Sequence, residues 1–193
     1  MLMQKHFDKS LLVGTEFRFL SYTVIRVSNE IEVNMNISTR LTRYLIDKNI
    51  PYQEIGHFHS NSSIGTAISS NISLSEIAKV VLLKNHEDRK LMAILPADHK
   101  ISLSALNDRL HGQYRLMKEQ DVYQVFSDCN LGAIPPAADA YNMNMVCDEK
   151  LDKLLNVYLE AGDHETLLCV DQEGFHALMT SGKHMNFSHQ VFH

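Results

Sequence analysis

The sequence is poor in the residues that mark several large classes of protein. Its 193 residues contain four prolines, eight glycines, no tryptophan and three cysteines, which are Cys129, Cys147 and Cys169. So few prolines and glycines exclude a fibrous or low-complexity chain. Three scattered cysteines without a CxxC motif exclude a disulfide scaffold, and an odd number without evident pairing indicates a reducing, cytoplasmic environment.

Long apolar runs and an excess of basic charge are also missing. No apolar run approaches the roughly 18 residues that span a bilayer, which argues against a membrane protein. Lys and Arg number 18 against 23 Asp and Glu, a net charge of −5. This balance argues against binding of duplex nucleic acid through a broad basic face. The hydrophobic content of 45% is that of an ordinary globular protein with one sizeable core.

The charges are unevenly distributed along the chain. Residues 79–118 contain eight Lys and Arg against four Asp and Glu, a net charge of +4. Residues 119–176 contain two Lys against twelve Asp and Glu, a net charge of −10. Two interpretations remain: solvated faces that mix in space, or a local basic strip that contacts a phosphate group.

The chain is expected to consist of three segments. Residues 1–35 have the composition of one or two strands, without a chemical motif or a secretory signal, and Met35 directly precedes the expected folded domain. We interpret residues 1–35 as an N-terminal extension that either reflects an upstream mis-start or adds an edge strand. Residues 36–180 form the predicted domain. Residues 181–193 lack an apolar period and are predicted to be a mobile C-terminal tail.

Short strands and short helices follow one another irregularly within residues 36–180. The apolar segments 78–83 and 91–95 predict a hairpin with a long polar loop. Further strands are expected at 52–57, 114–117, 141–147, 157–161 and 166–170. Helices are expected after the caps Ser38, Ser102, Asp148 and Asp171 and at 119–126, and residues 62–70 form a short helix or a loop. This order predicts an α+β fold rather than a doubly wound sheet.

Lys79 is the first candidate for a functional residue, because it interrupts the apolar strand IAKVVLL. An unpaired lysine is costly to bury. The side chain either points to solvent from a strand with one exposed face or lies on the floor of a cleft. In a cleft, its fixed charge would hold a phosphate or a carboxylate-like group.

Two turns supply the remaining candidates. His164, in the predicted turn between two strands, is either an exposed residue or one that positions or activates water. The other turn is an ordinary connection or a rigid loop whose prolines fix φ and whose glycine lets the backbone approach a ligand closely. It consists of Gly132, Ala133, Ile134, Pro135 and Pro136.

Most other catalytic and metal-binding patterns are absent. The sequence contains no GxGxxG, GxxxxGK[ST], GxSxG or HExxH motif, so that nucleotide-cofactor folds have no support. His57 and His59 form an HxH pair, but no third ligand follows at a recognisable spacing. Cys129 and Cys147 lack a basic neighbour that would favour a thiolate. We therefore predict that the protein uses no metal and no cofactor.

An ordered set of short motifs resembles a known family. The motifs are AKVVLLK (78–84), LPAD (95–98), CNLGAIPP (129–136), VCDEKL (146–151) and AGDH (161–164). Together they resemble the YbaK/EbsC, or prolyl-tRNA synthetase-associated, domain family over about residues 36–180. That family includes free-standing aminoacyl-tRNA deacylases and the editing domain inserted in bacterial prolyl-tRNA synthetases.

The resemblance implies a fold, an activity and partners. The fold would be an α+β domain with a curved mixed β-sheet, a partly open barrel, flanked by short helices and containing neither metal nor nucleotide cofactor. The activity would be hydrolysis of the ester between a wrong amino acid and the terminal ribose of tRNA. The implied partners are aminoacyl-tRNA, through its single-stranded CCA end, and a tRNA synthetase.

The resemblance also implies site residues. Lys79 matches the family's lysine on the first central strand, which faces the aminoacyl-adenosine end. Gly132 and Pro136 match its GxxxP loop, and His164 falls near the histidine that some members use. An aminoacyl ester is already activated, so positioning, an oxyanion donor and an oriented water suffice for hydrolysis. Only the CCA end must enter such a site, which a small basic strip can serve.

We therefore predict a trans-editing deacylase that acts on tRNA mischarged with Ala, Cys or Ser. Lys79 would anchor the terminal phosphate, the loop at 132–136 would orient the aminoacyl group, and His164 or the ribose hydroxyl would assist water. One alternative is a non-catalytic module that binds tRNA ends, nucleotides or protein on the same fold. Another is an accessory protein in which residues 1–34 dock a partner.

Overall fold

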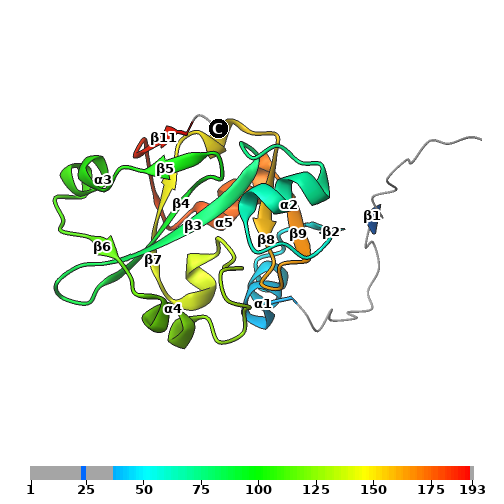
Figure 1. Cartoon of the computed structure of the whole chain (residues 1–193), viewed down its shortest axis with the longest axis horizontal. Coiled ribbons are helices and arrows are strands. Elements are labelled where there is room, and N and C mark those ends of the chain that lie inside the picture. Colours follow the sequence, from blue (N-terminus) through cyan, green and yellow to red (C-terminus); the bar gives the residue numbers. More distant parts are fainter. Residues whose placement is uncertain (1–22, 25–36, 192–193) are drawn as a thin grey trace, which may run out of the picture.

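The computed structural model describes residues 23–24 and 37–191 (Figure 1). The helices are α1 (Thr39–Asp47), α2 (Ser63–Ser70), α3 (Leu103–Leu110), α4 (Glu119–Val125) and α5 (Gln172–Met179), with the short 3₁₀ helices η1 (Ala138–Tyr141) and η2 (Leu151–Lys153). The strands are β1 (Thr23–Val24), β2 (Gln53–Gly56), β3 (Ile77–Lys84), β4 (Lys90–Pro96), β5 (His99–Ile101), β6 (Arg115–Leu116), β7 (Asn144–Asp148), β8 (Asn156–Glu160), β9 (Thr166–Asp171), β10 (Lys183–Met185) and β11 (Ser188–Gln190). None of these helices is long and apolar enough to cross a bilayer.

A nine-stranded mixed sheet forms the centre of the fold. Its strands run in the order β1-β2-β9-β8-β3-β4-β7-β10, and β6 lies beside β3. The pairs β3–β8, β4–β7 and β7–β10 are parallel, and the other pairs are antiparallel. The sheet is not closed into a barrel, and β5 and β11 form a separate two-stranded ribbon. The predicted α+β fold, a mixed sheet flanked by short helices, is confirmed.

Apolar side chains are buried on both faces of this sheet. The larger cluster packs α1 and α5 against the strands through residues such as Leu41, Phe175 and Leu159. A second cluster lies under α3 and includes Leu106 and Phe187. Because β3 and β4 contribute side chains to both clusters, they are held rigidly from two sides.

The predicted hairpin and the predicted helix caps are present. β3 and β4 pair continuously from Ala78–Pro96 to Lys84–Lys90. The side chains of Ser38, Ser102 and Asp171 each accept a hydrogen bond from a backbone N–H in the first turn of α1, α3 and α5. These bonds satisfy donors that the helix itself leaves unpaired. The segment 62–70, left open between helix and loop, contains α2.

The segment after α5 differs from the predicted mobile tail. Residues 183–185 form β10 beside β7, and residues 188–190 form β11 beside β5. Phe187 lies between these strands and is only 1% exposed. The prediction is therefore wrong for residues 183–190. Two three-residue strands and one buried aromatic residue are too short to produce a recognisable period in the sequence.

The predicted N-terminal extension falls almost entirely outside the described residues. Of residues 1–35 only Thr23 and Val24 are described, and as β1 they pair antiparallel with β2. The interpretation of the whole segment as a mis-start or an added strand stays a prediction.

Asp148 fastens the C-terminal strands to the sheet. Its side chain is fully buried, and its Oδ2 accepts hydrogen bonds from the backbone N–H groups of Phe187 and Ser188, at 3.2 and 3.0 Å, and from the Ser188 hydroxyl at 2.7 Å. Lys150 donates to Oδ1 from its backbone and its ammonium group. Burial raises the pKa of Asp148, but these donors outweigh it and hold the pKa below its ordinary value. The helix expected after Asp148 is only the short 3₁₀ helix η2.

We expect Asp148→Ala to lower the free energy of unfolding by about 3 kcal/mol, because it leaves several buried donors without an acceptor. Urea unfolding followed by circular dichroism measures this change. The matched control is Asp108→Ala, which removes an exposed carboxylate on α3. Equal effects of the two substitutions would contradict the anchoring role of Asp148.

Candidate functional site

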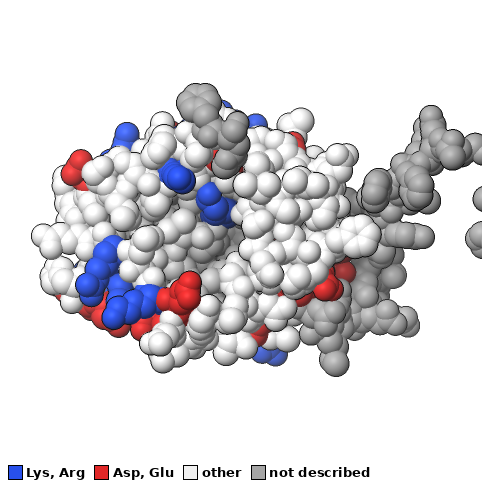
Figure 2. Space-filling model, viewed as in Figure 1, with Lys and Arg blue, Asp and Glu red and all other residues white. Residues whose placement is uncertain are grey.

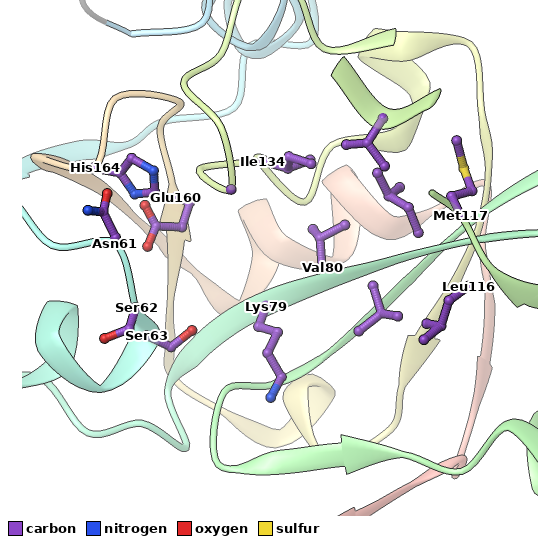
Figure 3. Close-up of a pocket in the computed structure, with 14 residues that line it drawn as sticks. Asn61, Ser62, Ser63, Lys79, Val80, Leu116, Met117, Ile134, Glu160 and His164 are labelled. Carbon is purple, nitrogen blue, oxygen red and sulfur yellow. The ribbon is translucent and has the colours of Figure 1, made fainter. Parts of the chain in front are cut away.

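A gap along one edge of β3 contains a cavity of about 420 Å³ (Figure 3). β3 pairs with β4 along nearly its whole length on the other edge. On the gap edge it pairs with β8 only at Ile77 and Ala78, and with β6 only at Leu83 and Lys84. Residues 79–82 lie between these two contacts and line the cavity.

The gap edge of β3 presents backbone hydrogen-bonding groups to the cavity. At one end of the gap, the carbonyl of Leu82 accepts a hydrogen bond from the N–H of Met117 at 2.9 Å. Alternate residues of a strand direct their backbone groups toward the same edge, so those of Val80 face the gap. A ligand that lies along β3 can therefore pair with the strand as well as with side chains.

The cavity has a polar end and an apolar end (Figure 3). Residues at the start of α2, at the end of β8 and around Gly132 make the polar end, and β6, α4 and Ile134 make the apolar end. The polar lining residues are Asn61, Ser62, Ser63, Lys79, Glu160 and His164, and the apolar ones include Leu116, Met117, Val122 and Ile134. Lys79 is the lysine and Glu160 the carboxylate of this lining.

Lys79 is half-buried, and its ammonium group is held in place by the turn between β4 and β5. Nζ donates hydrogen bonds to the carbonyls of Ala97 at 3.0 Å and His99 at 2.5 Å. Burial lowers the pKa of Lys79, and the nearby Asp98 opposes this effect. An ammonium group has three N–H bonds, so one remains for a ligand.

Three loops are hydrogen-bonded together at the polar end. The N–H of Asn130 donates to the carbonyl of Gly162 at 2.7 Å, and the His164 ring donates from Nε2 to the carbonyl of Leu131 at 2.8 Å. The N–H of Ser60 donates to the carbonyl of His164 at 3.1 Å. These bonds fix the segments before α2, after α4 and between β8 and β9 relative to one another.

Gly132 and His164 both adopt backbone conformations with positive φ, at +96° and +64°. A glycine adopts this conformation without strain, whereas a residue with a Cβ atom does so at a cost. The His164 ring lies against Gly132, since a Cβ atom at position 132 would be 3.5 Å from its Cε1 atom. His164 is only 6% exposed, so the alternative of an exposed turn residue does not hold.

The structure brings together some of the sequence-predicted site residues and separates others from the cavity. Lys79, Gly132, Ile134 and His164 line the same cavity. Ala133, Pro135 and Pro136 are buried and do not contribute to the lining. They belong to the same loop, and the two prolines restrict its backbone.

Sequence analysis missed Glu160, which lies one residue beyond the last β3–β8 pair. Its Oε1 accepts a hydrogen bond from the Thr66 hydroxyl at 3.4 Å, and its Oε2 is buried without a hydrogen-bond donor in the described part of the chain. Burial and then the charge of Asp163 raise the pKa of Glu160 to about 7. In the sequence this glutamate is one of many acidic residues, and nothing marks it as buried.

One group of side chains that could together hold a metal ion occurs in residues 23–24 and 37–191. The ligand atoms of Cys147, Asp152 and His184 lie within 4.8 Å of one another, and none of these residues lines the cavity. His184 already donates a hydrogen bond from Nδ1 to the Asp152 carboxylate at 2.8 Å. Neither His57 nor His59 belongs to this group.

The fold and the cavity define a mixed-sheet domain with a partly polar cavity at an open strand edge. The chain belongs to the aminoacyl-tRNA editing domain family, whose model matches residues 65–178, more than half of the sequence. The predicted resemblance to this family is confirmed. No curated protein matches the chain.

Solved structures with the same fold have low sequence identity to this chain. The hypothetical protein APE2540 has a TM-score of 0.69 over 78% of this chain and 99% of its own, with 16% identity. A candidate trans-editing enzyme for prolyl-tRNA synthetase has a TM-score of 0.67 over 79% of this chain and 96% of its own, with 14% identity. A candidate signal transduction protein from Marinobacter aquaeolei VT8 has a TM-score of 0.64 over 77% of this chain and 30% of its own, with 22% identity. These likenesses establish the fold.

We expect Glu160→Gln to stabilise the protein in a pH-dependent way. The folded protein holds the Glu160 proton more tightly than the unfolded chain, so the wild type loses stability as the pH rises from about 4.5 to about 7. The variant should be more stable by about 3 kcal/mol near pH 8 and by under about 1 kcal/mol near pH 5. Urea unfolding at both pH values measures the difference.

The matched control is Glu165→Gln, an exposed glutamate on the same turn. Its effect on stability should be small at both pH values. A stability difference for Glu160→Gln that does not change with pH would contradict the raised pKa.

Proposed function

We propose that this protein is a trans-editing aminoacyl-tRNA deacylase. It hydrolyses the ester that joins a wrong amino acid to the terminal ribose of a free tRNA, and it does so without a metal. The observation that carries the proposal is the cavity in the gap of β3, which combines Lys79, Gly132 and His164 in a member of an editing-domain family. The proposed location is the cytoplasm, and the proposed partners are aminoacyl-tRNA and a tRNA synthetase.

Charge and shape of the site support binding of a single-stranded tRNA end. The face that carries β3 is hollowed, and Lys and Arg side chains lie at two places around the hollow (Figure 2). A few cations suffice for the terminal phosphates, because affinity for a single strand comes from backbone contacts and base stacking together. Lys79 is the cation inside the cavity and is the proposed anchor of the terminal phosphate.

The proposed reaction needs little besides positioning. Water attacks the ester carbonyl carbon, the bond to the ribose oxygen breaks, and the ribose hydroxyl regains a proton as the free amino acid leaves. The backbone around Gly132 orients the aminoacyl group. The His164 ring donates from Nε2 to Leu131, so in its neutral form Nδ1 is the nitrogen that can accept a proton from water. The neighbouring ribose hydroxyl is the other proposed acceptor.

The proposed amino acids are Ala, Cys and Ser. A small side chain fits a cavity of about 420 Å³ that must also receive the terminal ribose. A pocket distinguishes side chains that differ by one methylene by only about 1–3 kcal/mol. Selectivity among small amino acids therefore depends on the choice of tRNA as well as on the pocket.

We expect Lys79→Ala to lower kcat/KM for deacylation of mischarged tRNA at least tenfold, about 1.4 kcal/mol or more of transition-state stabilisation. The assay follows release of labelled amino acid from Ala-, Cys- and Ser-charged tRNA. The control Lys183→Ala removes an exposed cation from β10, at the far edge of the sheet, and should stay within about threefold of wild type. A Lys79→Ala variant that folds and keeps activity within about threefold would contradict the role of Lys79.

A further inference from the structure

Within residues 23–24 and 37–191, no cation pairs with the carboxylate of Glu160. Lys79 and Glu160 directly follow the last pair of the β3–β8 register, Ala78–Leu159, and their side chains diverge (Figure 3). Lys79 runs toward the turn after β4, where the carbonyls of Ala97 and His99 accept its hydrogen bonds. No ion pair of the described residues includes Glu160.

The surroundings of Glu160 favour a cation over an anion. Asp163 lies close enough to oppose ionisation of Glu160. The Asp163 oxygens already accept hydrogen bonds from the N–H groups of Glu165 and Thr166 and from the Thr166 hydroxyl. Thr66 gives Glu160 only a long hydrogen bond at 3.4 Å. Two carboxylates and no paired cation produce a negative potential at this end of the cavity.

Glu160 can reach a ligand in the cavity. Its side chain lines the cavity, although Oε2 is covered. The last torsion of a glutamate is broad, so a rotation of the carboxylate turns Oε2 toward the cavity at little cost. A ligand ammonium group can then replace the missing partner of the buried oxygen.

The proposed substrate carries one cation next to its reacting bond. The α-ammonium group of an esterified amino acid is separated from the carbonyl carbon by a single atom. Gly132 and His164, which would surround that carbonyl, line the same polar end of the cavity as Glu160. Asp163 does not line the cavity and its oxygens already accept hydrogen bonds, so Glu160 is the one carboxylate that the cavity lining offers, whereas a metal ion needs several ligands.

We propose that Glu160 binds the α-ammonium group of the esterified amino acid, so that the site accepts aminoacyl-tRNA and rejects N-acylated aminoacyl-tRNA and peptidyl-tRNA. This inference rests on the proposed deacylase function and specifies which substrates the site excludes. An acylated nitrogen is neutral and larger, and it leaves the Glu160 carboxylate without its counter-charge. The protein thus hydrolyses tRNA esters of amino acids with a free amino group, and it does not hydrolyse esters of peptides or of N-acylated amino acids.

The test compares alanyl-tRNA with N-acetylalanyl-tRNA at about pH 7.5. Each kcat/KM is divided by the uncatalysed hydrolysis rate of the same ester, because acetylation itself makes the ester less labile. We expect wild type to prefer the free amine at least thirtyfold and Glu160→Gln to prefer it less than about threefold. The control Glu165→Gln, which alters an exposed carboxylate outside the cavity, should retain the wild-type preference.

Other outcomes overturn the proposal. If Glu160→Gln lowers hydrolysis of both substrates equally, Glu160 acts as a general base or supports the site, and does not recognise the amine. An unchanged preference in Glu160→Gln, or a wild type without a preference, overturns it too.

A binding measurement separates this inference from the proposed function. The probes are the amide-linked 3′-alanylamino-3′-deoxyadenosine and its N-acetyl form, which cannot be deacylated, and calorimetry measures their affinities. If wild type binds the free amine more tightly and Glu160→Gln does not, the inference is supported. This holds even if wild type releases no amino acid from tRNA, and in that case only the proposed deacylase function is wrong. Equal affinities for the two probes overturn the inference even if deacylation is observed.

Discussion

The site depends on how the edge of β3 is shared between two partners. β8 pairs with the first residues of β3 and β6 with the last, and no strand in the described part of the chain pairs with the four residues between them on that side. An open edge inside a sheet exposes unpaired backbone groups, which proteins usually cover. Here the loop at 130–134 and the start of α2 border the gap, so that the edge becomes the floor of a cavity.

The same arrangement separates two charges that would otherwise neutralise each other. Lys79 and Glu160 directly follow the last β3–β8 pair. The Lys79 ammonium group donates to backbone carbonyls, whereas Oε2 of Glu160 has no donor among the described residues. The end of a charged tRNA carries a phosphate and an α-ammonium group on either side of the ester. A cavity with one fixed cation and one fixed carboxylate matches that order of charges.

The polar loops supply the rigidity that such a site needs. Asn130, Leu131 and His164 are tied by backbone and ring hydrogen bonds, and His164 packs against Gly132. Catalysis by positioning loses effect when groups shift by about an ångström, so the proposed deacylase reaction would depend on these bonds. Pro135 and Pro136 are buried members of the same loop, and each fixes its φ angle.

Sequence analysis predicted the elements that have strong local signals. The apolar segments of β3 and β4 and the caps Ser38, Ser102 and Asp171 are local features, and they are correct. Lys79 is a candidate from the sequence because a lysine within an apolar strand is unusual, and it lines the cavity.

What the sequence did not predict depends on contacts between distant segments. Glu160 lines the cavity because β8 pairs with β3, which the sequence around it does not show. The strands β10 and β11 form because they pair with β7 and β5, which are distant in the sequence. Asp148 looks like a helix cap in the sequence, but its partners are Phe187 and Ser188, nearly forty residues later. No local pattern carries that information.

The most direct measurement is the release of amino acid from mischarged tRNA under conditions in which substrate exceeds protein. If the cavity in the gap of β3 is a deacylase site, labelled Ala, Cys or Ser is released over many turnovers, far faster than the ester hydrolyses alone. If the protein instead binds charged tRNA in a salt-dependent way and leaves the ester intact, the cavity is a binding site and the account of its chemistry is wrong.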